Sequence, residues 1–137
     1  MITAYQIAIV SAGVFFLNGL VTGVWKYLQI AASDNAQAHP YVDIAHRASL
    51  MYSFATILIA VFVDISQLPN MVEIMATLAL IVYFALAIAI YMIHGYLGDT
   101  DNQLREINAV TRWFMWTLIA AELGGFLILF YGVLVAL

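Results

Sequence analysis

The stretch "VEIMATLALIVYFALAIAIYMIHGY", residues 72–96, runs for 25 residues with almost only apolar side chains. About 20 apolar residues in a helix are enough to cross a hydrocarbon core of about 30 Å. Three further segments have the same character, at about residues 4–30, 43–66 and 109–137. Because each is continuously apolar and does not alternate over about ten residues, the four segments predict membrane-spanning helices and not barrel strands.

The composition agrees with a membrane protein. The chain has 137 residues, of which 66% are hydrophobic and 9% charged, and its mean hydropathy is +1.01. A soluble domain is about half apolar and about a quarter charged. The expected fold is therefore an all-α integral membrane four-helix bundle in which residues 1–137 form a single transmembrane domain. The expected partner is the lipid bilayer, and no nucleic-acid partner is expected.

The basic residues predict the orientation of the bundle. Connectors 31–42 and 97–108 fall on one side of the membrane if every segment crosses it once. All four basic residues lie at or near these connectors: Lys26, Arg47, Arg105 and Arg112. The positive-inside rule therefore places both connectors in the cytoplasm and both termini outside, in a membrane of the bacterial inner type.

Each predicted helix carries polar side chains, which are costly in a bilayer and tend to mark function. The second segment has His46, Ser49 and Ser53 at helical spacing. Other candidates are Asn18 in the first segment, Tyr52 in the second, Tyr91 and His94 in the third and Glu122 in the fourth. Glu122 lies ten residues beyond Arg112, roughly 15 Å deep at 1.5 Å per helical residue. The polar residues of the second and third segments converge on the cytoplasmic half, as expected for a site.

Structural roles are the alternatives for these residues. His46 could bond to a backbone carbonyl at headgroup depth, and His94 could be an ordinary interfacial histidine. Glu122 could be protonated and bonded to Asn18 or to a helix carbonyl, or it could handle protons. Glycines at positions 19, 23, 124 and 125 predict close approach between helices.

The histidines limit the metal chemistry that the chain could support. The absence of cysteine excludes thiolate and iron–sulfur sites, and His46 has no second histidine or carboxylate one turn away on its face for zinc. A haem iron needs only one axial imidazole from the protein, so His46 is compatible with haem b. A bis-histidyl cytochrome would need a second histidine, for which His94 is the candidate.

Two motifs carry a resemblance to a known family. The first segment contains Gly19-Leu20-Val21-Thr22-Gly23, and the second contains Ala45-His46. This pattern resembles the small four-helix membrane isomerases of the styrene oxide isomerase and hydroxylaminobenzene mutase family. The resemblance covers roughly residues 13–62 and, more loosely, residues 72–96. The chain departs from the family at residues 52–53, where Tyr-Ser replaces the family's Asn-Gly.

The resemblance implies a homotrimer that binds haem b and isomerises a small apolar aromatic substrate, converting an epoxide to a carbonyl or rearranging a hydroxylamine. It implies His46 as the iron ligand and Tyr91, with Tyr52, at the substrate. The intramembrane polar residues add Asn18, Ser49 and Ser53 as candidates near the cofactor, and His94 and Glu122 as a candidate second ligand or proton group.

Other classes of function remain open. One is a non-catalytic haem or electron-transfer protein, or an accessory subunit of a membrane complex, which the Tyr52-Ser53 departure favours. Another is a trimeric glutathione or eicosanoid enzyme, whose second helix typically carries Arg, Asn and Glu, whereas this helix has only Arg47 at its start. A channel or small multidrug transporter would need more intramembrane charge than Glu122 supplies.

Overall fold

The computed structural model describes residues 2–105 and 107–137. Within these ranges the chain forms four α-helices: α1 (Ala4–Ala32), α2 (Pro40–Ile65), α3 (Asn70–Leu97) and α4 (Ala109–Ala136). Each is long and apolar enough to cross a membrane. The predicted all-helical fold with four helices that could span a membrane is therefore confirmed for the described residues. The helix bounds differ from the predicted segments by at most three residues.

The largest difference in helix bounds is at the start of α2. The helix begins at Pro40 and not at residue 43 as predicted, because proline fits the first turn of a helix, where its missing N–H is not needed. His39 caps this turn, since its Nδ1 accepts a hydrogen bond of 3.3 Å from the backbone N–H of Tyr41. The connector between α1 and α2 is correspondingly short.

Two glycines near the end of α3 have different roles. Gly98 follows the helix with φ +61°, the left-handed conformation that glycine adopts readily and that ends many helices. Gly95 lies inside α3 and is buried. A Cβ at Gly95 would come within 2.9 Å of Val42 Cγ2, so its small size allows α2 to pack closely against α3.

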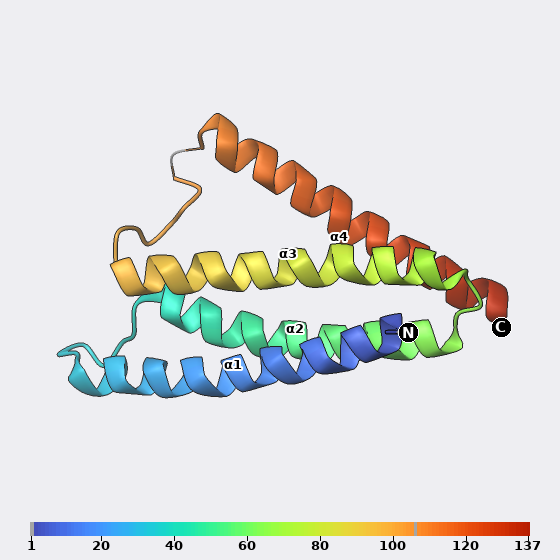
Figure 1. The fold of residues 1–137 in the computed structure, drawn as a ribbon. Coiled ribbons are helices and arrows are strands. Elements are labelled where there is room, and N and C mark those ends of the chain that lie inside the picture. Colours follow the sequence, from blue (N-terminus) through green and yellow to red (C-terminus); the bar gives the residue numbers. More distant parts are fainter. Residues whose placement is uncertain (1, 106) are drawn as a thin grey trace.

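Helices α1, α2 and α3 lie side by side, and α4 crosses them obliquely (Figure 1). The connectors 33–39 and 98–108 are at one end of the bundle. The turn 66–69, the start of α1 and the C-terminus are at the other end. This arrangement follows from four antiparallel helices joined by short segments.

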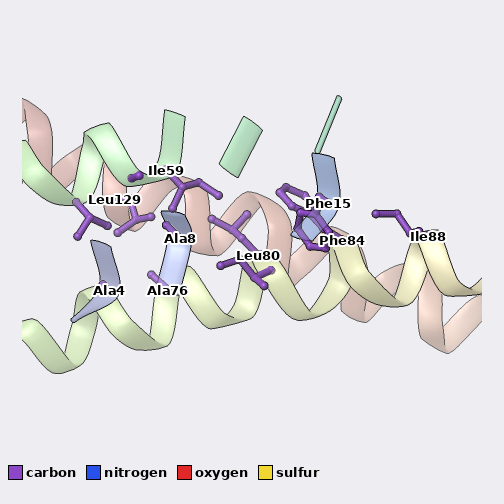
Figure 2. Close-up of a cluster of buried hydrophobic side chains, with 12 residues drawn as sticks. Ala4, Ala8, Phe15, Ile59, Ala76, Leu80, Phe84, Ile88 and Leu129 are labelled. Carbon is purple, nitrogen blue, oxygen red and sulfur yellow. The ribbon is translucent and has the colours of Figure 1, made fainter. Parts of the chain in front are cut away.

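The buried core uses all four helices and is richest at the end that carries the C-terminus. Figure 2 shows this cluster, which includes Ala8 of α1, Ile59 of α2, Leu80 of α3 and Leu129 of α4. Small residues on α1 let that helix approach its neighbours closely. Long apolar side chains on the outer surface of the bundle remain exposed, as a lipid-facing surface requires.

The buried residues of helix α4 all lie in its C-terminal half. Its buried residues are Gly125, Leu129, Gly132 and Val133. A Cβ at Gly125 would come within 2.9 Å of the backbone oxygen of Ala76, so α4 touches the backbone of α3 at this point. Towards its N-terminus α4 diverges from α3 (Figure 1). The two helices therefore enclose a wedge that widens towards the connector 98–108.

Candidate functional site

His46 faces α1 and is held by a backbone carbonyl. Its Nδ1 lies 2.8 Å from the oxygen of Gly19. A carbonyl oxygen can only accept a hydrogen bond, so Nδ1 carries the proton and Nε2 has a free lone pair. Nε2 has no hydrogen-bond partner among the described residues. The structure thus fixes the tautomer of His46 and leaves the other ring nitrogen able to bind a metal.

Gly23 makes room for the His46 ring. A Cβ at Gly23 would come within 2.9 Å of His46 Cε1 and 3.1 Å of Nδ1. A Cβ at Gly19 would come within 2.6 Å of Leu50 Cδ2. The predicted close approach at the Gly19 and Gly23 pair is therefore confirmed, and α2 is the helix that approaches.

A hydrogen bond to a backbone carbonyl was the structural role considered for His46 from the sequence, and the bond to Gly19 is such a bond. It does not compete with metal binding, because it uses Nδ1 alone. Histidines that ligate metals commonly donate their other ring N–H to a carbonyl or carboxylate, which orients the ring and raises its basicity. The geometry at His46 therefore suits both a packing role and an axial ligand.

Asn18 links three helices next to His46. Its Nδ2 donates to Ser49 Oγ at 2.9 Å and to Met92 Sδ at 3.6 Å. Ser49 is fully buried and its own hydroxyl donates to the backbone oxygen of Ala45 at 2.7 Å. Ser53 is also buried, one turn further along α2. The predicted polar stripe of α2 therefore packs inside the bundle, where Asn18 satisfies part of it.

Tyr52 lies on a different side of α2. Its ring stacks on Phe84 of α3, with centroids 4.2 Å apart and an interplanar angle of 8°. Positions 46 and 52 are roughly 120° apart around a helix of 3.6 residues per turn. Within one chain, His46 therefore faces α1 while Tyr52 faces α3.

Tyr91 and His94 gather around Tyr41 at the connector end. Tyr41 stacks on Tyr91 with centroids 6.0 Å apart and contacts the His94 ring at 5.3 Å. The Tyr41 hydroxyl accepts a hydrogen bond of 2.6 Å from the backbone N–H of Gln103, which ties down the α3–α4 connector. Tyr41 and His46 are roughly 140° apart around α2. Because His94 packs against Tyr41, His94 and His46 lie next to different sides of α2.

His94 also has a partner in the connector. Its Nδ1 lies 2.8 Å from Asp99 Oδ1, and since a carboxylate accepts, the imidazole donates. This hydrogen bond holds the pKa of Asp99 below its usual value. The carboxyl group of Asp99 is therefore ionised at neutral pH.

Glu122 lies near the two tyrosines. The carboxyl group is within electrostatic range of both Tyr52 and Tyr91. Its Oε1 is buried and has no hydrogen-bond partner among the described residues. Tyr52 and Tyr91 are thus both within electrostatic range of the Glu122 carboxyl group, and Tyr52 lies on a different side of α2 from His46.

Sequence reasoning missed a second buried carboxylate. Glu73 is 8% exposed and Thr77, one turn later on α3, is fully buried. Glu73 Oε1 and Thr77 Oγ1 both lack a hydrogen-bond partner among the described residues. A glutamate in the first turn of a helix is usually explained by its favourable interaction with the positive end of the helix dipole. The sequence pattern therefore does not indicate that the Glu73 side chain is buried.

An ion-pair network at the start of α2 was also missed. Asp43 Oδ1 lies 2.5 Å from Lys26 Nζ, and Asp43 Oδ2 lies 2.8 Å from Arg47. The structure thus joins one carboxylate to two basic residues. The spacing of four residues along one helix was the available signal, because side chains at this spacing are neighbours.

Comparison with known proteins adds no relative: no family model, no curated protein and no solved structure matches the chain. Among residues 2–105 and 107–137, no three His, Asp or Glu side chains gather into a group that could hold a metal ion. The functional argument for this chain therefore depends on its own geometry, above all on the environment of His46.

Proposed function

We propose that the protein is a haem b-binding membrane isomerase that acts on a small apolar aromatic substrate. The observation that supports this most is the hydrogen bonding of the two ring nitrogens of His46. Its Nδ1–H is bonded to the oxygen of Gly19, its Nε2 is unpartnered among the described residues, and the missing Cβ at Gly23 lets the ring pack against α1. These features fit an axial haem ligand, for which one neutral imidazole with a free Nε2 is sufficient.

The remaining chemistry is assigned to side chains of this chain. When bound, a ferric haem supplies a Lewis acid for the oxygen of an aromatic epoxide or hydroxylamine. Tyr91 donates a hydrogen bond that orients this oxygen, and Tyr52 takes over part of the role of the family's asparagine. Substrate and product are isomers, so the reaction needs no co-substrate and no electron acceptor. An apolar substrate reaches the site from the lipid.

The proposal includes a homotrimer. In one chain, His46 lies on the α1 side of α2 while Tyr52 and Tyr91 lie on the α3 side. In a cyclic assembly, the α1–α2 side of one copy can face the α3–α4 side of the next, which would bring both groups to one interface. A monomeric protein with full isomerase activity would contradict this part of the proposal.

Detergent-purified protein is expected to show a Soret band in its visible absorption spectrum. His46→Ala should remove most of the band, and added imidazole should restore part of it by entering the space that the ring leaves. His94→Ala is the matched control and should leave the band unchanged. Wild-type protein that has no Soret band after haem is supplied would overturn the proposal, as would His46→Ala protein that keeps it.

A non-catalytic haem or electron-transfer protein is the second candidate. One observation favours it: Tyr52, at the place of the family's asparagine, is stacked against Phe84 as a packing residue. In the bis-histidyl form of this candidate, a second histidine completes a low-spin site, and His94→Ala would convert the spectrum to high-spin. A spectrum that is high-spin in wild type and unchanged in His94→Ala would favour the isomerase.

We further propose that the end carrying residues 33–39 and 98–108 lies in the cytoplasm of a bacterial-type inner membrane. The chain has no cysteine, so single cysteines can report its orientation cleanly. In intact cells, a membrane-impermeant maleimide is expected to label Gln67→Cys but to label Asp34→Cys only after permeabilisation. Both positions are exposed. The reverse labelling pattern would invert the orientation.

A further inference from the structure

The wedge between α3 and α4 contains a cavity of about 840 Å³. It lies between the end of α3, the connector 98–108 and the first half of α4, where α4 diverges from the bundle (Figure 1). Pockets for small molecules typically measure about 300–1,000 Å³. The first half of α4 has no buried residue, so in one chain the cavity is open at the side of the bundle.

The lining of the cavity changes from apolar to polar along its length. Ile90, Phe114 and Met115 provide apolar surface from α3 and α4. Phe114 also contacts the ring of Tyr83, with centroids 5.9 Å apart, where the two helices converge. Polar side chains of the connector, including Asp99, line the other end. The cavity therefore suits an amphiphile with its apolar body between the helices and its head at the connector.

The charge at the polar end favours a positive head over a negative one. Among the described residues of the connector, Asp99 and Asp101 are acidic and Arg105 is basic. Arg105 also lines the cavity, and its guanidinium is paired with Asp101 at 2.8 Å. Asp99 bonds only to the imidazole of His94 among the side chains that the structure describes, and it is partly exposed. An anionic head would meet net negative charge, whereas an ammonium would find a carboxylate.

We propose that this cavity binds a cationic amphiphile, an amine with an aromatic or alkyl body, which enters from the lipid and places its ammonium beside Asp99. The proposal is independent of His46 and of haem. It assigns a ligand class to the part of the α3–α4 wedge next to the connector, whose lining residues have no role in the proposed isomerase.

Equilibrium binding to protein in lipid nanodiscs can test the ligand class, with empty nanodiscs subtracted. Radiolabelled decylamine, decanol and decanoate share one body and differ in the head. Decylamine is expected to bind saturably at one molecule per chain, about twofold to fivefold more tightly than decanol, the range typical of one partly exposed ion pair. Decanoate should bind most weakly. No saturable decylamine binding, or decanoate binding as tightly as decylamine, would overturn the proposal.

Two variants locate the site. Asp99→Asn should weaken decylamine about twofold to fivefold while leaving decanol binding unchanged, which also shows that the cavity is intact. Phe114→Ala should weaken both probes, because it removes apolar surface that they share. Asp34→Asn is the matched control, an exposed carboxylate on the other connector at the same end. If Asp34→Asn weakens decylamine as much as Asp99→Asn, the effect is general surface charge and the proposal fails.

Discussion

Gly125→Val is expected to push α4 away from α3 and to lower the free energy of unfolding by about 1–3 kcal/mol, the usual cost of overpacking a tight contact. The first atom of the new side chain would come within 2.9 Å of the Ala76 backbone oxygen and 3.1 Å of Leu80 Cγ. A backbone oxygen cannot move without shifting α3. The midpoint of denaturation in sodium dodecyl sulfate, followed by circular dichroism, measures the effect.

Gly124→Val is the matched control for this prediction. It makes the same substitution one residue earlier, where a Cβ meets nothing within 4 Å. Its effect should stay within about 0.5 kcal/mol, as for most substitutions at open positions. Equal losses at positions 124 and 125 would mean that valine disturbs α4 itself and that the contact with Ala76 is unimportant.

Gly23→Ala is expected to lower the free energy of unfolding by about 1–3 kcal/mol, because the new methyl group crowds the His46 ring. The new methyl group would lie 2.9 Å from Cε1. The ring cannot turn away freely, since its Nδ1 is bonded to Gly19 at 2.8 Å, and breaking this bond leaves polar groups unpaired in an apolar setting. Unfolding free energies from the same denaturation assay provide the measurement.

A double-mutant cycle separates this contact from other effects of the alanine. In the His46→Ala background the ring is absent, so Gly23→Ala should cost less than about 0.5 kcal/mol, and the interaction energy of the pair should exceed about 1 kcal/mol. Gly13→Ala is the control on the same helix, because a Cβ there meets nothing within 4 Å. A penalty that persists without His46 would show that the ring is not its cause. The cycle needs no haem, so it tests the geometry independently of the proposed function.

The sequence was sufficient to predict the helices. Long uninterrupted apolar runs allow few structures in a bilayer, because backbone groups without water must bond within the segment. The helix at residues 72–96 and its three companions could therefore be placed to within about three residues. Pro40 and Gly98 lie at helix ends, since each acts through its own backbone conformation.

The candidate site was only partly predictable. Spacing along α2 correctly grouped Ser49 and Ser53 inside the bundle. It did not reveal that Asn18 bonds to Ser49, that Lys26 pairs with Asp43, or that Glu73 is buried. Such pairings depend on which helices are neighbours, and the spacing within one helix carries no information about that.

What the sequence determined by itself is therefore the number, length and ends of the helices, and the presence of His46 near the end of one of them. Only the tertiary structure decided that His46 faces α1, that Tyr52 faces α3 and that α4 diverges to form a wedge. The physical reason is that lipid is as apolar as the interior of the bundle. Helix faces that turn outward and inward carry similar side chains, so direct packing contacts, such as that of Gly23 with His46, set the arrangement.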